Sequence, residues 1–190
     1  MARRTEFLKV RSEPPRTSLV FIDETGANRS MTKRQAWAPI GVRAVDHVPA
    51  NKGKNVTLVG AIRLGGPVVM RTMLEGLKKD TFTYFISKFL APKLKPGDVV
   101  VMDNLRAHYD QRALQAIERA GAFYLFLPPY SPDLNPIEMF WNALKRRFER
   151  AGANCVEQVR SCLAGAWKSL KKLDLSDMFT ACGYHNSPQP

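Results

Sequence analysis

Three short hydrophobic runs along the chain predict the strands of a sheet. The first, SLVFIDET at residues 18–25, is apolar on both faces, and Asp23 falls on the same face as Phe21. The second is VVVM at residues 99–102, and the third is FYLFLP at residues 123–128. Strands that are apolar on both faces are typical of a sheet covered on both sides.

Two further segments carry strand patterns. Residues 55–73 (NVTLVGAIRLGGPVVMRTM) predict a hairpin that bends at Gly65-Gly66-Pro67. Residues 35–45 (QAWAPIGVRAV) predict another strand, interrupted at Pro39 because proline cannot donate to a sheet ladder.

Apolar residues recur at helical spacing elsewhere and predict helices over 81–90, 111–120, 136–148, 156–170 and 176–182. Gly121 is a suitable C-cap for the second of these. Asn135 makes a good N-cap for the third, and Pro136 suits its first position. Strands alternating with helices in this order predict one α/β domain, with a mixed sheet and helices on both faces.

Acidic residues stand where two of the strands end. Asp23 closes the first run and Asp103 follows the second. Active sites of open α/β sheets form beyond the carboxyl ends of strands, so parallel neighbouring strands would place these carboxylates side by side. A third acid, Glu138, lies in the first turn of its helix, at the edge of the buried face.

Three carboxylates with open positions suit Mg²⁺, which prefers oxygen ligands. Two such ions, about 4 Å apart, can activate a nucleophile and stabilise the leaving oxygen of a phosphodiester. We therefore predict that Asp23, Asp103 and Glu138 converge to hold two divalent ions.

Simpler roles exist for each acid. An Asp at a strand end is commonly a turn former, and Glu138 also suits first-turn charge against the helix dipole. Asp133 is an alternative third ligand, its other role being to shape the proline-rich loop. Glu24 points to the opposite face of the strand from Asp23, so we exclude it from the cluster.

The net charge of +12 and pI of about 9.9 indicate a polyanionic partner, most simply nucleic acid. The alternative is a basic protein that is merely soluble. Residues 139–172 hold eight basic residues against two glutamates, and Lys145 falls on the Glu138 side of its helix. With Arg146, Arg147 and Arg150, it predicts a DNA-backbone contact surface without base specificity, or else a solvated helix face.

Three cysteines (Cys155, Cys162 and Cys182) show no zinc-like spacing and predict reduced thiols. The first residues are basic but lack an apolar signal region, and no window approaches a membrane-spanning length. We therefore expect a cytoplasmic protein with no membrane partner.

The order SLVFIDETG, VVVMDNLRAH and LPPYSPDLNPIEMFWNALKRR resembles the catalytic domain of mariner-superfamily transposases, nearest to their bacterial insertion-sequence branch. The resemblance covers about residues 18–150 and, more loosely, the helices beyond. It implies a ribonuclease-H-like fold with a catalytic triad at Asp23, Asp103 and Glu138, and the 35-residue spacing of the last two fits.

The same resemblance implies chemistry and partners. It implies two Mg²⁺ ions, for which Mn²⁺ can substitute, used to cut transposon ends and join 3′ hydroxyls to target DNA, commonly at TA. The partners are then double-stranded DNA at transposon ends and target, and a second copy of the chain, at a bacterial nucleoid. Asn104 and His108 match polar family positions, and we assign both to DNA contact; a cap or surface group is the plainer role for His108. Trp37 matches another motif and is expected to pack beside the site.

The chain departs from this family at its start, because only about 20 residues precede Asp23 where helix-turn-helix modules are usual. We expect residues 1–17 to be a basic arm or truncated linker, and residues 18–190 to be the catalytic domain with C-terminal helices. The chain would then be a truncated copy, an isolated domain, or half of a split transposase with a separate helix-turn-helix subunit. Two rival functions stay open: a metal-dependent nuclease without strand transfer, and an inactive DNA-binding remnant.

Overall fold

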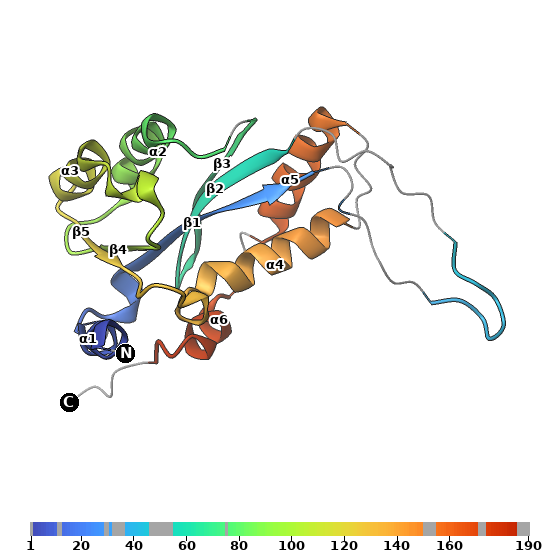
Figure 1. Ribbon diagram of the computed structural model, residues 1–190, viewed down its shortest axis with the longest axis horizontal. Coiled ribbons are helices and arrows are strands. Elements are labelled where there is room, and N and C mark those ends of the chain that lie inside the picture. Colours follow the sequence, from blue (N-terminus) through green and yellow to red (C-terminus); the bar gives the residue numbers. More distant parts are fainter. Residues whose placement is uncertain are drawn as a thin grey trace.

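A central sheet organises the protein (Figure 1). The computed structural model describes residues 2–10, 13–28, 31, 37–45, 55–74, 76–149, 155–170 and 174–185. Within them, the sheet has five strands in the order β3-β2-β1-β4-β5. The strands are β1 Leu19–Ala27, β2 Val56–Arg63, β3 Gly66–Met73, β4 Val99–Met102 and β5 Phe123–Phe126. β1, β4 and β5 are parallel, while β2 runs antiparallel to both β1 and β3.

Helices cover both faces of this sheet, as the sequence pattern predicts (Figure 1). Their bounds are α1 Ala2–Val10, α2 Lys79–Phe85, α3 Gln111–Arg119, α4 Pro136–Glu149, α5 Val156–Leu170 and α6 Ser176–Ala181. α2 continues through a π-helical turn at Ile86–Leu90. α2 and α3 pack on one face of the sheet, and α4, α5 and α6 pack on the other.

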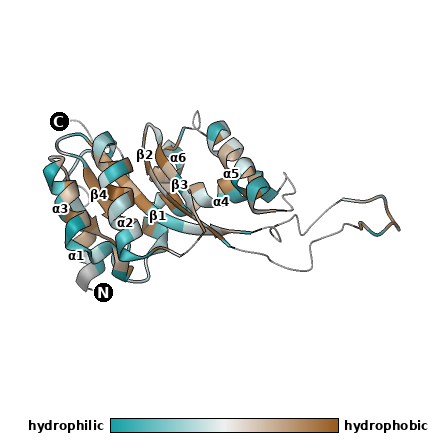
Figure 2. Cartoon of the chain, turned by 90° about the horizontal axis from the view of Figure 1, so that it is seen from above, coloured by the Kyte–Doolittle hydropathy of each residue, from teal (hydrophilic) through white to brown (hydrophobic). Residues whose placement is uncertain are grey.

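The side chains of β1 alternate between the two faces of the sheet, and both faces are buried. Phe21 belongs to the hydrophobic cluster on the α4 side, whereas Val20 and Ile22 belong to the cluster on the α2 and α3 side. All three side chains are fully buried. Figure 2 shows hydrophobic residues along the strands and hydrophilic ones on the outer surfaces of the helices, as expected for a sheet covered on both sides. β1 is therefore the central strand, and it carries Asp23 two residues past its last pairing with β4.

The seating of α4 on the sheet depends on one missing side chain. Gly60 of β2 pairs with Asp23 of β1, and a Cβ at Gly60 would lie 2.6 Å from Trp141 Cη2. The six-membered ring of Trp141 therefore packs against the backbone of β2 at a point where only glycine leaves room. Since Trp141 lies one turn after Glu138, this contact also sets where Glu138 stands relative to Asp23.

Residues near the C-terminus hold the loop before α4. The Tyr184 hydroxyl donates to the Leu134 carbonyl at 2.8 Å, and this hydrogen bond is buried. The Tyr184 and Phe179 rings both pack edge-on against Phe21 of β1. The C-terminal segment therefore links the central strand to the loop that enters α4.

Most predicted elements are confirmed, including the 55–73 hairpin, the three short strands and the helices. Gly121 follows α3 with φ +76, as a C-cap glycine requires. The strand predicted over 35–45 is wrong: residues 37–45 contain no strand, and residues 35–36 lie outside the described residues. Val42 N donates to Pro39 O at 2.9 Å, so the chain turns where the strand would have continued. Trp37, predicted to pack beside the site, is fully exposed.

The segment before β1 contains a helix where we expected an arm or linker. Phe7 of α1 is buried in the cluster beneath α4. Arg4 donates to Ser131 Oγ at 3.1 Å and forms an ion pair with Asp133. α1 therefore contacts the proline-rich loop that precedes α4. None of the described helices is long and apolar enough to cross a membrane.

The contact between Gly60 and Trp141 gives a stability prediction. Gly60→Ala forces the indole to move and should lower the free energy of unfolding by about 1–3 kcal/mol, as overpacking does. Urea unfolding monitored by tryptophan fluorescence measures the change. Gly26→Ala is the matched control, because it lies on the exposed end of β1 with nothing within 4 Å of its new methyl group. Equal stability of the two variants would contradict this account of how α4 is seated.

Candidate active site

Parallel pairing of β1 and β4 brings two acids together. Phe21 pairs with Val101, so two residues further along each strand come Asp23 and Asp103. Asp103 directly follows the last residue of β4, whereas Asp23 lies within β1, which continues to Ala27 instead of ending at Asp23 as the sequence predicts. Both acids nevertheless stand just beyond the parallel pairing of β1 with β4, at the edge where active sites of α/β sheets form. The expectation that these strands are parallel neighbours is confirmed.

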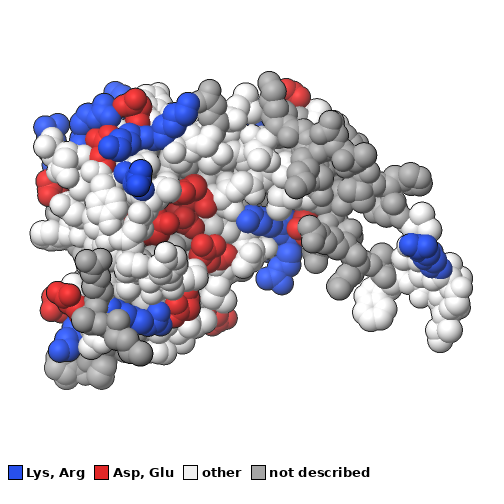
Figure 3. Space-filling model, in the orientation of Figure 1, with Lys and Arg blue, Asp and Glu red and all other residues white. Residues whose placement is uncertain are grey.

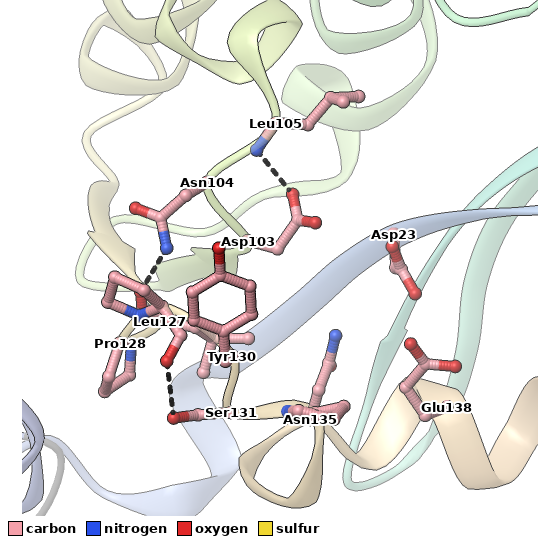
Figure 4. A pocket seen from close by; sticks show the side chains of 12 residues that line it. Asp23, Asp103, Asn104, Leu105, Leu127, Pro128, Tyr130, Ser131, Asn135 and Glu138 are labelled. Carbon is pink, nitrogen blue, oxygen red and sulfur yellow. Dashed lines mark hydrogen bonds between the residues drawn. The ribbon is translucent and has the colours of Figure 1, made fainter.

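Glu138 approaches the same place from α4. It is exposed and lies in the first turn of that helix, which begins at Pro136 as the sequence predicts. Figure 4 shows the carboxyl groups of Asp23 and Glu138 turned toward one another, while that of Asp103 turns toward Leu105. The three acids thus come from three elements widely separated in the sequence.

The three carboxyl groups border a single cavity of about 470 Å³. Its other wall is the loop from Leu127 to Pro132, followed by Asn135. Tyr130 stands fully exposed on this wall with φ 55, a backbone conformation that is uncommon for a bulky residue. Asn104 also lines the cavity, but its amide is engaged with Leu127 O at 2.6 Å and with the Tyr109 hydroxyl at 2.6 Å.

Burial and crowding by like charges make the Asp23 carboxylate unfavourable. Asp23 is only 6% exposed. Burial, and then the carboxylates of Glu24, Glu138 and Asp103, raise the pKa of Asp23 to about 8. A carboxyl group in this state gains most from a nearby cation, whose charge reverses the local balance.

Asp103 has the opposite environment, because donors surround it. Leu105 N donates to Asp103 Oδ1 at 3.0 Å, and His108 Nδ1 contacts the same oxygen at 2.7 Å. Burial acts to raise the pKa of Asp103, but the His108 and Leu105 hydrogen bonds lower it below its usual range. Asp103 is therefore held ionised beside Asp23, which takes a proton readily.

His108 is a correction to our prediction of a DNA contact. Its side chain is fully buried, with Phe82 at a ring distance of 4.5 Å, so it presents no surface to DNA. Its Nε2 lies 3.6 Å from Glu24 Oε2. Burial acts to lower the pKa of His108, but hydrogen bonding to Asp103 and the nearby Glu24 carboxylate raise it to about 9.

The cavity fits a divalent cation. Beside its three carboxyl groups, the buried Asn135 Oδ1 has no hydrogen-bond partner. Carboxylate and amide oxygens that lack a positively charged or hydrogen-bonding partner suit Mg²⁺ or Mn²⁺. Among the described residues, however, no group of three or more His, Cys, Asp or Glu side chains lies close enough together to hold a metal ion as they stand. The arrangement is an open one, with the acids on its border.

Asp133, the alternative third ligand, does not line the cavity. Its carboxylate faces away and pairs with Arg4 of α1. The role of shaping the loop therefore describes Asp133 better than the role of a ligand.

The predicted DNA-contact residues on α4 stand beyond the acids. Arg146 and Arg147 are exposed, and Lys145 is half-buried. Both arginines also donate to backbone carbonyls of their own helix. Arg150 lies outside the described residues. Figure 3 shows acidic side chains gathered near the middle of this face, with Lys and Arg around them.

Sequence reasoning missed two features of the site. It did not find that Glu24 and His108 contact one another behind Asp103. The available signal was strand alternation, which points Glu24 to the face of the sheet opposite to Asp23. It also treated Asn135 as a cap, whereas its side-chain oxygen is unpaired at the cavity. The available signal was the position of Asn135, a polar residue directly before Pro136 and three residues before Glu138.

A mixed sheet that carries one acid on its central strand, one directly after the neighbouring parallel strand and a third on α4 is the arrangement expected of a ribonuclease-H-like fold. Residues 18–160, well over half of the chain, match the family described as DDE superfamily endonuclease. The chain therefore belongs to this family.

Similar proteins agree with this membership. The chain is 36% identical over 107 residues to the Tcb1 transposase of Caenorhabditis briggsae, covering 55% of this chain and 39% of that protein. It is 34% identical over 74 residues to the Tc1 transposase of Caenorhabditis elegans, covering 39% and 27%. The chain thus spans well under half the length of these relatives. Both come from nematodes, so the bacterial branch stays a prediction.

Solved structures show the same fold. The Mos1 mariner paired-end complex with Mn superposes with a TM-score of 0.72 at 14% identity, covering 95% of this chain and 57% of that one. The catalytic domain of Mos1 mariner transposase gives a TM-score of 0.60 at 13% identity, covering 95% and 81%. The predicted ribonuclease-H-like fold is confirmed.

The raised pKa of Asp23 predicts how stability depends on pH. Since this pKa is about 8 in the folded chain against an ordinary 3.8, the folded protein keeps a proton that the unfolded chain releases. The stability contributed by this group therefore falls as the pH rises from about 4 to about 8. Asp23→Asn removes the effect. In EDTA at pH 8.5, the free energy of unfolding of this variant should exceed that of the parent by at least about 2 kcal/mol.

Urea titrations of both proteins at pH 4.5 and pH 8.5 measure this difference, which should nearly vanish at the lower pH. Asp110→Asn is a control of opposite sign, because the Arg112 side chain lowers the pKa of Asp110 to about 2. If Asp23→Asn were no more stable than the parent at pH 8.5, Asp23 would not carry the unfavourable charge inferred here.

Proposed function

We propose that this chain is the catalytic domain of a DNA transposase, which cuts transposon ends and joins their 3′ hydroxyls to target DNA. The observation that carries the proposal is the convergence of Asp23, Asp103 and Glu138 on one cavity. Burial and the neighbouring carboxylates make the ionised form of Asp23 unfavourable there. Membership in the DDE superfamily endonuclease family supports the same chemistry.

In this proposal, the carboxyl groups of Asp23, Asp103 and Glu138 hold two divalent ions, Mg²⁺ or Mn²⁺. When bound, such ions activate a water or hydroxyl and stabilise the leaving oxygen of a phosphodiester. The protein supplies the rest. Asp23 lies within the central strand, Asp103 directly follows β4, and Glu138 stands on a helix seated by Trp141. The cavity is therefore shaped before the phosphate arrives.

The proposed partners are DNA and a second copy of the chain. The strong positive charge suits a DNA backbone, and Lys145, Arg146 and Arg147 flank the acids along α4. Among the similar structures are a Mos1 strand transfer complex and a Mos1 paired-end complex with the left transposon end. A dimer follows from the need to bring two ends together. A separate helix-turn-helix subunit and a bacterial nucleoid location also belong to this proposal.

The proposal predicts loss of chemistry without loss of folding. Asp23→Asn, Asp103→Asn and Glu138→Gln should each reduce Mg²⁺-dependent cleavage of transposon-end DNA by at least about 1,000-fold, because each removes a charged ligand. Cleavage is measured on labelled DNA, with thermal unfolding as the folding check. Asp133→Asn is the matched control and should retain activity, since Asp133 pairs with Arg4 outside the cavity. Near-parental activity in Glu138→Gln would remove that residue from the triad.

Strand joining separates the proposal from its rivals. Pre-cut transposon ends incubated with a supercoiled target plasmid should yield covalently joined products with Mg²⁺ or Mn²⁺. Cleavage without joined products would favour a nuclease that only hydrolyses. Neither product, in a chain that still binds DNA, would favour an inactive remnant.

The cationic side of α4 predicts a salt-dependent DNA affinity. Replacing Lys145, Arg146 and Arg147 together by Gln should weaken binding to duplexes of unrelated sequence about equally and reduce the salt slope of log Kd by about 2–3. Fluorescence anisotropy between 50 and 200 mM salt measures both. Replacing Lys88, Lys95 and Arg119 by Gln is the charge-matched control, at exposed sites outside α4. An unchanged slope in the α4 variant would show that DNA binds elsewhere.

A further inference from the structure

His108 has no role in the chemistry proposed above, yet it is among the most enclosed polar residues of the protein. It lies in the 3-10 turn Arg106–Tyr109, is fully buried, and is not one of the residues that line the cavity. A buried imidazole is costly unless its nitrogens are satisfied, so the partners of His108 indicate what it does.

We propose that Glu24 and His108 form a brace that fixes the orientation of the Asp103 carboxyl group for divalent-cation binding. The inference rests on the proposed function of the three acids. His108 is thereby a positioning residue, acting through Asp103, and Glu24 is the outer support of the brace.

The inner end of the brace is well defined. His108 Nδ1 lies 2.7 Å from Asp103 Oδ1 and 3.2 Å from the Asp103 main-chain oxygen. Both neighbours are acceptors, so Nδ1 carries the hydrogen and donates. Leu105 N donates to the same Oδ1 at 3.0 Å (Figure 4). Two donors therefore hold one oxygen, and within the described part of the chain none donates to Oδ2. That second oxygen is left for a ligand.

The outer end of the brace faces Glu24. His108 Nε2 and Glu24 Oε2 are both buried without a hydrogen-bond partner, and they lie 3.6 Å apart. A small approach would join these two atoms, which are complementary in kind. Because neighbouring residues of a strand point to opposite faces, Asp23 reaches the cavity directly while Glu24 reaches Asp103 from behind, through His108.

Such a brace matters because Asp103 is otherwise free to turn. Its side chain is 46% exposed and stands just beyond the last residue of β4. Rotation about the terminal bond of an Asp side chain is soft, so packing alone fixes the carboxyl plane poorly. Hydrogen bonds from residues behind a metal ligand typically contribute 10- to 100-fold to metal affinity.

Paired substitutions at His108 test the brace. An Asn side chain places its amide nitrogen near the position of Nδ1 and can still donate to Asp103, whereas Gln places its amide nearer Nε2 and cannot. We expect His108→Asn to bind Mn²⁺ within about 3-fold of the parent, and His108→Gln to bind about 10-fold or more weakly. Isothermal titration calorimetry with Mn²⁺ measures this without DNA or turnover. Equal affinities of the two variants, whether both parental or both weakened, would overturn the proposal.

Glu24 offers a test that leaves the buried imidazole in place. Glu24 is partly exposed, and Glu24→Ala removes the outer support, whereas Glu24→Gln keeps an oxygen facing Nε2. Mn²⁺ affinity should fall about 3-fold or more in the first and recover in the second. Unchanged affinity in Glu24→Ala would overturn the part assigned to Glu24, and this arm decides the matter if a His108 variant does not fold.

The same titrations separate failure of the brace from failure of the proposed function. Asp23→Asn, which leaves the brace intact, should bind Mn²⁺ far more weakly than the parent. If the parent binds no better than Asp23→Asn, the three acids do not hold the ion and the proposed function fails. If the parent binds well and all His108 and Glu24 variants match it, only the brace is overturned.

Discussion

The candidate site depends on the contact between Trp141 and the backbone at Gly60, because that contact holds like charges near one another. Gly60 pairs with Asp23 across β1 and β2, and Trp141 follows Glu138 by one turn of α4. Carboxylates repel and would not assemble unaided. The contact of the buried Trp141 is apolar, so it does not depend on the charge of the carboxylates, and it keeps Glu138 opposite Asp23. The remaining hydrophobic packing of α4, through Phe140, Leu144 and Phe148, supports the same geometry.

Charge then divides the protein between a centre and its surroundings. The chain carries +12 overall, yet its cavity is bordered by acids, and burial together with these acids raises the pKa of Asp23 to about 8. A positively charged protein attracts phosphates, while an acidic cavity admits cations and repels a bare phosphate. In the proposed function, a divalent ion held by these acids would resolve this opposition, because it would compensate their charge and present positive charge to a DNA phosphate. In that function, the basic residues along α4 and the acids of the cavity thus serve one substrate.

Much of this could be predicted from strand ends and helix starts, where local rules apply. Asp23 and Asp103 are predicted to lie together because each follows a run of apolar residues, and Glu138 is predicted to join them because Asn135 and Pro136 mark the start of a helix. The structure places all three on the border of one cavity. Local rules fail where a contact is made between elements. The His108 contact with Glu24 depends on how the turn after β4 packs against the back of β1, which no spacing reveals.

Two other segments show the same limit. Residues 37–45 alternate like a strand, but the turn at Pro39 prevents pairing and leaves Trp37 exposed. The residues before β1 read as an arm because they are charged, and only the burial of Phe7 shows that a helix there packs onto the core. In both cases the deciding contact lies far away in the sequence, or is absent where the pattern predicts one.

The most direct test of the account is to locate the ions. Crystals of the protein soaked in Mn²⁺, with diffraction measured at the manganese absorption edge, would show each ion by its anomalous scattering. The account predicts two peaks about 4 Å apart in the cavity, within coordination distance of Asp23, Asp103 and Glu138, with Asp103 bound through Oδ2. Peaks elsewhere on the protein, with none touching these three carboxyl groups under saturating Mn²⁺, would contradict it.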